Sequence, residues 1–247
     1  MTDAHNSRAM LAFLMGLAAA SANVLGGYFV VRGDWSRRYL QYFLALGAGF
    51  MLATSLLEML PEALRLAGEK ALYLALIGFF IVHFFEHTLA PHFHFGEETH
   101  TVEMLPQRAS TAALLGLLIH TFFDGVAIAA GFLVSNWLGA VIFVAVFLHK
   151  LPEGFTVASL FLASGHSRRR ALLAAALLGA ATLFGVLLTN VLRSQLTYAL
   201  PLAAGVTLYV AASDLIPEVN RERGPGMAGM VLLGAAVLFL LHHFAHI

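Results

Sequence analysis

The sequence predicts an all-α membrane protein with eight transmembrane helices. Of its 247 residues, 60% are hydrophobic and only 11% are charged, and the mean hydropathy is +0.81. A soluble domain carries about 25% charged residues, so this chain lacks the polar side chains for a water-exposed surface. Apolar stretches of the length needed to cross a hydrocarbon core about 30 Å thick recur along the chain.

Eight apolar runs, separated by charged residues or by proline and glycine, mark the expected helices. Strands of a transmembrane barrel would alternate apolar and polar residues, which these runs do not, so helices are expected. In chain order, the helices are expected near residues 9–31, 38–61, 71–90, 109–133, 136–164, 169–191, 196–219 and 226–246. They make one transmembrane domain over residues 1–247, with a His-containing loop at 91–108.

The basic residues predict that both ends of the chain lie outside the cytoplasm. With the N-terminus outside, the inside loops hold nine arginines, whereas the outside segments hold three arginines and one lysine. The positive-inside rule favours this orientation, which places loop 91–108 inside. The short loops and the lack of targeting features fit a prokaryotic inner membrane.

Charge and cysteine content exclude several kinds of partner and site. The formal net charge is zero, so the chain has no basic surface for nucleic acid. It has no cysteine, which excludes disulfides and thiolate metal sites. The lipid bilayer is therefore an expected partner and nucleic acid is not.

Two pairs of segments repeat within the chain. Residues 44–63 align without gaps with residues 200–219, 156 positions later, and residues 120–132 align with residues 149–161, 29 positions later. The two members of each pair cross the membrane in opposite directions. This pattern predicts an inverted repeat of three helices, a central pair and three helices. Transporters commonly have such symmetry, with the substrate site near the midplane.

The central pair carries the polar residues that most need an explanation. His120 and Asp124 are four positions apart and share one helix face, as do His149 and Glu153. A charged side chain at the middle of a membrane helix costs roughly 2.5–3.5 kcal/mol on insertion scales. A divalent cation bound by two imidazoles and two carboxylates would offset that cost. This donor set suits zinc and tolerates iron, manganese or cadmium.

The segments "HTFFDG" (120–125) and "HKLPEG" (149–154) resemble the paired signatures of the Zrt/Irt-like (ZIP) divalent-metal transporters. The eight helices, the outside termini and the His-containing loop are similar too. The resemblance implies a transporter that moves Zn²⁺, and often Fe²⁺, Mn²⁺ or Cd²⁺, towards the cytoplasm, usually as a homodimer. It implies no organic cofactor. The implied metal ligands are His120, Asp124, His149 and Glu153.

Two positions depart from the most-described members of that family, and a third adds a candidate ligand. Those members often have Asn and a carboxylate or amide, which help to build a second metal site, where this chain has Thr121 and Lys150. We hypothesise that Lys150 takes the place of the second ion, leaving one metal per protomer; alternatively, it snorkels to the membrane surface. Met51 is either a soft thioether ligand, as in similar proteins, or an ordinary residue facing the lipid or the core.

Other polar residues near the helix ends are candidates for a metal pathway. Glu58 and Asp214 each lie three residues before a proline of the paired second and seventh helices, which suggests polar steps at an entrance or exit. His83, Glu86 and His87 end the third helix on the inside. There they either receive outgoing metal or are simple interfacial residues.

Two further groups of histidines have less regular spacing. The loop residues His92, His94 and His100, together with three glutamates, suggest weak and labile metal binding, the alternative being a polar connector. The histidines within 242–246 either gather metal outside or mark the end of the last helix.

The main rival function is an intramembrane zinc hydrolase, in which Glu153 would activate a metal-bound water. The sequence has no HExxH motif, and both carboxylates of the central pair are needed as ligands. A metal sensor would need a soluble signalling domain. We therefore expect a transporter rather than an enzyme.

Overall fold

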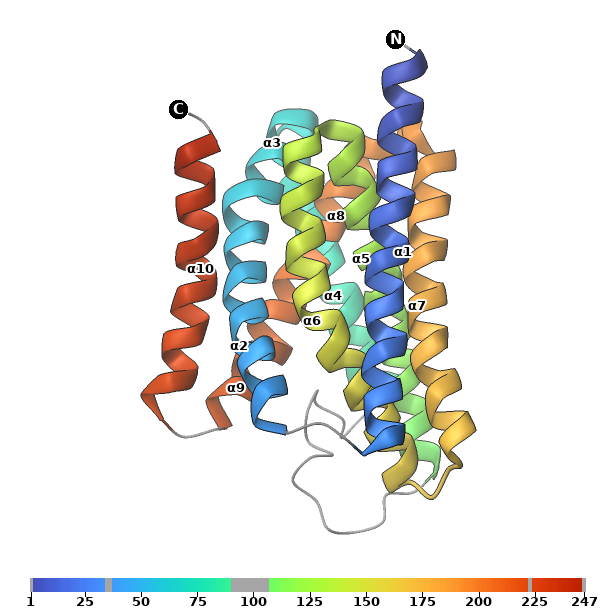
Figure 1. Cartoon of the computed structure of the whole chain (residues 1–247). Coiled ribbons are helices and arrows are strands. Elements are labelled where there is room, and N and C mark those ends of the chain that lie inside the picture. The colour runs from blue at the N-terminus through green and yellow to red at the C-terminus, as the bar shows by residue number, and fades with distance from the viewer. Residues whose placement is uncertain (1, 34–36, 90–106, 222–223, 246–247) are drawn as a thin grey trace.

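A computed structural model describes residues 2–33, 37–89, 107–221 and 224–245, and these contain helices but no strands. The long helices run side by side as one bundle (Figure 1). The elements in chain order are α1 (Thr2–Arg32), α2 (Arg37–Thr54), η1 (Ser55–Met59), α3 (Leu60–Ala67), α4 (Lys70–Leu89), α5 (Gln107–Val134), α6 (Asn136–Ala163), α7 (Arg168–Val191), η3 (Arg193–Gln195), α8 (Leu196–Tyr209), η4 (Val210–Leu215), α9 (Ile216–Arg221) and α10 (Pro225–Ala245).

Eight helical stretches in the described residues are long and apolar enough to cross a membrane, as predicted. Their bounds are Asn6–Arg32, Gln41–Ala67, Lys70–Thr88, Ser110–Val134, Asn136–Ala163, Arg168–Val191, Arg193–Arg221 and Pro225–His243. The second stretch extends beyond its predicted end at residue 61 because the helix continues through Pro61, and the seventh ends two residues beyond the predicted end at 219. The start of α1 and the end of α10 lie at the same end of the bundle (Figure 1).

The second and seventh spans each contain a π-helical segment just before that proline. In η1, the backbone N–H of Leu60 donates to the carbonyl of Ser55, five residues earlier. In η4, the N–H of Ile216 donates to the carbonyl of Ala211 in the same way. Such wide turns recur at functional sites and absorb the hydrogen bond that a proline disrupts.

The fifth span, α6, is a single helix although Pro152 lies inside it. A proline inside a helix removes one backbone hydrogen bond and often kinks or breaks the helix. The helix instead continues to Ala163, and neighbouring helices pack closely around this point. Gly154 contacts α1 so closely that a Cβ atom at this position would lie 1.9 Å from the carbonyl oxygen of Asn23.

Three further close backbone contacts hold the bundle together. A Cβ atom at Gly125 of α5 would lie 2.0 Å from the carbonyl oxygen of Thr182 in α7. A Cβ atom at Gly49 of α2 would lie 1.8 Å from a backbone carbonyl oxygen of α10. A Cβ atom at Gly205 of α8 would lie 1.8 Å from a backbone carbonyl oxygen of α4. Only glycine permits helices to approach in this way, which compensates for the weak hydrophobic driving force in lipid.

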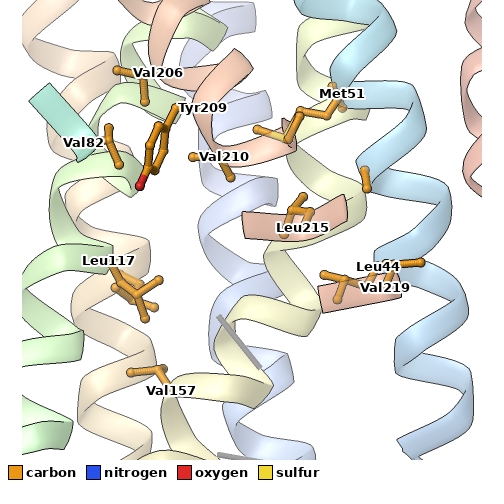
Figure 2. Packing of buried hydrophobic residues seen from close by; sticks show 14 of the residues in the cluster. Leu44, Met51, Val82, Leu117, Val157, Val206, Tyr209, Val210, Leu215 and Val219 are labelled. Carbon is orange, nitrogen blue, oxygen red and sulfur yellow. The ribbon is translucent and has the colours of Figure 1, made fainter. Parts of the chain in front are cut away.

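The largest buried apolar cluster joins α2, α4, α5, α6, α7, α8, the η4 segment, α9 and α10, and Figure 2 shows part of it. Met51 belongs to this cluster and is fully buried. The cluster fixes α2 and α8 against the central pair α5 and α6, and so positions the polar residues described next.

Candidate metal centre

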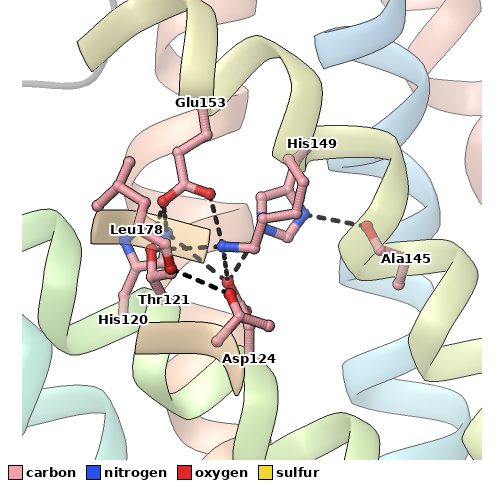
Figure 3. Close-up of polar contacts among 9 residues, drawn as sticks. His120, Thr121, Asp124, Ala145, His149, Glu153 and Leu178 are labelled. Atoms are coloured by element: carbon pink, nitrogen blue, oxygen red, sulfur yellow. Dashed lines mark hydrogen bonds and ion pairs between the residues drawn. The ribbon is translucent and has the colours of Figure 1, made fainter. Parts of the chain in front are cut away.

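The four predicted ligands lie together in the interior of the bundle. His120 and Asp124 project from successive turns of α5, and His149 and Glu153 project from successive turns of α6 towards them (Figure 3). Each offers a ligand atom within 4.8 Å of the others, and no more than 1% of any of these residues is exposed. The pairing of His with a carboxylate four residues later therefore brings four donors to one point, as the sequence predicts.

The hydrogen bonds of His149 orient its ring towards the centre. Its Nδ1 lies 3.0 Å from the carbonyl oxygen of Ala145. Because a carbonyl only accepts, Nδ1 donates there, and in a neutral ring Nε2 then carries a lone pair. That Nε2 lies 3.3 Å from Oδ2 of Asp124, which is also an acceptor when the carboxylate is ionised. A proton or a cation is needed between two such lone pairs, and a ligating histidine commonly has this kind of supporting bond.

His120 completes the arrangement from α5. Its Nε2 lies 3.3 Å from Oε1 of Glu153 and 3.9 Å from Oδ2 of Asp124. Nδ1 of His120 and Oδ1 of Asp124 have no hydrogen-bond partner. Buried polar atoms without partners are costly. A divalent cation among these atoms would satisfy nitrogen and oxygen donors together, so the donor set fits a metal.

Lys150 points into the same centre. Its Nζ lies 2.6 Å from Oδ2 of Asp124 and 2.5 Å from Oε2 of Glu153, and it donates to the hydroxyl of Thr121 at 3.3 Å. Thr121 in turn donates to Oε1 of Glu153. The lysine side chain is fully buried, so it does not extend to the membrane surface as the snorkelling interpretation required.

The net charge of this centre depends on its two imidazoles. With both imidazoles neutral, the form that binds a metal, two carboxylates and one ammonium sum to one negative charge in a buried volume. The ammonium lies between the two carboxylates and holds them apart from each other. Met51 contributes to the adjacent apolar cluster (Figure 2), and its role as a ligand stays a prediction.

Glu58 lies apart from the centre and contacts two other helices. Its Oε1 is 2.6 Å from Nδ1 of His242 in α10, and its Oε2 accepts a hydrogen bond from Nε1 of Trp137 in α6 at 3.3 Å. The sequence suggested a role for Glu58 and for the C-terminal histidines separately. Only the fold brings them together.

Asp214 of η4 and Glu86 of α4 form a pair of acidic side chains whose carboxyl groups interact. Glu86 also interacts with Tyr209, whose ring lies 5.9 Å from that of His83. His87 donates from Nδ1 to the carbonyl of His83 in its own helix and is exposed. The predicted pathway residues of α4 and the seventh span are therefore neighbours. His92, His94 and His100 lie outside the described residues.

Comparisons with known proteins point to one family of transporters. A sequence model of the family described as ZIP zinc transporter matches residues 97–242, more than half of the chain. The zinc transporter ZupT of Salmonella arizonae is 29% identical over 256 residues, covering 92% of this chain and 96% of the relative. Zinc transporter ZIP9-B of Xenopus laevis is 26% identical over 275 residues, covering 90% and 88%.

Human zinc transporter ZIP4 is 36% identical over 132 residues, which is 52% of this chain but only 19% of that relative. The family match includes both α5 and α6, which hold all four predicted ligands. The bacterial and amphibian relatives are instead matched over nearly their whole length. This chain therefore belongs to the ZIP zinc transporter family.

Proposed function

We propose that this protein carries Zn²⁺ across a membrane into the cytoplasm, with His120, Asp124, His149 and Glu153 as the ligands of the transported ion. The observation that carries the proposal is the convergence of these four buried side chains, whose nitrogen and oxygen ligand atoms all lie within 4.8 Å of one another. The absence of thiolates keeps binding reversible. The same nitrogen and oxygen donors also suit Fe²⁺, Mn²⁺ and Cd²⁺.

Lys150 substitutes for a second metal ion in this proposal. Its ammonium contacts both carboxylates of the centre, the position from which a second cation would neutralise them. Thr121 supports it from α5. The centre then binds one metal per protomer.

The inverted repeat gives the carrier a means of alternating access. Close glycine contacts support the repeat, because they recur at its spacing of 156 residues. Gly49 packs on the backbone of Val231, and Gly205 packs on the backbone of Ala75. The shift of 156 residues relates Gly49 to Gly205 and Ala75 to Val231. Movement of one three-helix unit against the other around a fixed central pair would expose the centre first outside and then inside.

The two central helices make a comparable pair of contacts. Gly154 lies on the backbone of Asn23, and its counterpart Gly125, 29 residues earlier, lies on that of Thr182. Thus α6 packs on α1 as α5 packs on α7. This correspondence supports an arrangement of three, two and three helices within one transport domain.

The route on either side of the centre uses the remaining polar residues. Glu58 is a step at the outer end and Asp214 with Glu86 a step at the inner end, with His83 and His87 beside them. The loop at 91–108 then receives metal in the cytoplasm. The start of α1 and the end of α10 lie at the same end of the bundle, which is consistent with both termini lying outside (Figure 1). The working form is a homodimer in a prokaryotic inner membrane.

The hydrolase alternative has less support from the geometry. Glu153 already accepts from Thr121 and Lys150 and lies 3.3 Å from His120. A carboxylate held by three partners is poorly placed to take a proton from an attacking water. The names of the matched relatives describe transporters.

Zinc uptake into proteoliposomes containing the purified protein tests the proposal. Saturable uptake is expected, with its loss in His149→Ala and in Glu153→Ala. Glu69→Ala, at an exposed turn, is the matched control for a glutamate. A protein that binds zinc but moves none, with or without a pH gradient, would refute the carrier function.

A further inference from the structure

A second pairing of imidazole with carboxylate lies outside the central site. Glu58 of η1 and His242 of α10 are 184 positions apart in sequence, yet Oε1 and Nδ1 are 2.6 Å apart. Neither residue belongs to the four-ligand centre. The pair joins the second span to the last one near the end of the bundle where α10 finishes (Figure 1).

Both carboxylate oxygens of Glu58 accept a hydrogen bond, and only the one bonded to His242 can exchange its shared proton for a metal. A carboxylate only accepts, so the indole N–H of Trp137 donates to Oε2 and Nδ1–H of His242 donates to Oε1. The indole cannot ligate a metal, and its bond fixes the plane of the carboxylate as supporting groups do in metal sites. The proton between Oε1 and Nδ1 is the one that a metal would replace.

The distance between these two atoms is close to what a shared metal needs. Zinc binds nitrogen and carboxylate oxygen at about 2.0–2.2 Å with tetrahedral angles, so two such donors lie about 3.3 Å apart. The atoms of Glu58 and His242 would therefore separate by about 0.7 Å on binding. The side chain of His242 is 43% exposed, which leaves space for that movement and for water as the remaining ligands.

The exposure of the two residues differs in a way that suits capture of an ion from solution. The Glu58 side chain is only 8% exposed, whereas that of His242 is 43% exposed. Glu58 also lies in a π-helical turn, a distortion frequent at functional sites. An ion would therefore meet the histidine first and the buried carboxylate second.

The same pairing recurs at the position related by the repeat. A shift of 156 residues carries Glu58 to Asp214 and Glu86 to His242, and Asp214 and Glu86 also interact. Each pair thus joins a π-helical segment to the helix packed on it. The pair at Glu58 differs because it combines an acid with an imidazole, the donor chemistry of the central site.

We infer that Glu58 and His242 form a capture site for a divalent cation of the zinc class, outside the central site and before it on the route. The binding itself does not depend on transport, and only its role as a step on the route rests on the proposed function. Trp137 acts as a positioning residue for the carboxylate.

Tryptophan fluorescence tests the binding directly. The chain has two tryptophans, so a Trp35→Phe variant leaves Trp137 as the reporter beside Glu58. In a background with His149→Ala, which removes a ligand of the central site, zinc titration should change the Trp137 emission saturably. Adding Glu58→Gln or His242→Ala should weaken the response about tenfold or more.

His243→Ala is the matched control, since it removes the neighbouring histidine of the same helix and should leave the response unchanged. A response that persists in His242→Ala, or the absence of any response in the reporter protein, would overturn the site. Circular dichroism and size-exclusion chromatography establish that each variant is folded.

Transport kinetics test the role in capture. In the otherwise native chain, His242→Ala should raise the zinc concentration for half-maximal uptake and leave the maximal rate unchanged. If fluorescence shows zinc binding at this site but His242→Ala leaves uptake at low zinc unaltered, the capture role is refuted. If the native protein transports no zinc, the proposed function fails while the fluorescence result stands on its own.

Discussion

Replacing Lys150 with methionine removes the ammonium group from the central site and keeps the side chain at nearly the same length. Among the described residues, no other ammonium lies in that site. Lys150 contacts Asp124 at 2.6 Å and Glu153 at 2.5 Å, and all three residues are buried. Glu153 would keep the hydrogen bond from Thr121, whereas Asp124 would lose its shortest contact. Two carboxylates would then face each other with no cation between them.

The cost of this change follows from the burial of the pair. Removing one partner of a buried ion pair destabilises a protein by about 3–5 kcal/mol. At roughly 2–4 °C per kcal/mol for a chain of this size, the expected fall in melting temperature is about 6–20 °C. Zinc should restore much of this loss, since it brings two positive charges to the same carboxylates.

Thermal unfolding of the purified protein in detergent measures the effect, first with a chelator and then with saturating zinc. The chain has only one other lysine, Lys70, which is exposed at the start of α4, and Lys70→Met is therefore the matched control. The zinc-dependent rise in melting temperature should be larger in Lys150→Met than in the native chain. Equal melting temperatures for the native chain, Lys70→Met and Lys150→Met in chelator would refute the reasoning.

Three further predictions follow from the same structure. Lys150→Asp should bind two zinc ions per protomer by elemental analysis, because it replaces the ammonium with a ligand; one ion with unchanged transport would contradict the ion-substitute role. Thr121→Val should weaken zinc binding in calorimetry, since Glu153 loses a donor and Lys150 an acceptor; unchanged affinity would argue against that supporting role. Gly154→Ala should lower stability by about 1–3 kcal/mol through overpacking against Asn23, whereas Gly229→Ala, with open space around it, should not, and equal melting temperatures would count against tight α1–α6 packing.

The sequence predicted the helices well because membrane spans are recognised from composition over a local window. Its main error was at the end of the second span, where the proline at 61 suggested that the helix stops. The helix continues through this position because the π-helical segment before it absorbs the disrupted hydrogen bond. That adjustment depends on backbone geometry rather than on residue type.

What the sequence determined by itself was the number of apolar spans and the set of His120, Asp124, His149 and Glu153 as one group. Both follow from short-range regularities, since hydropathy is summed over neighbours and residues four apart share a helix face. The tertiary structure decided which way Lys150 points, because a long side chain in mid-span can turn inward or towards the interface. It also decided that Glu58 meets His242 across 184 residues, a contact set by how α10 packs on α2, which no local pattern encodes.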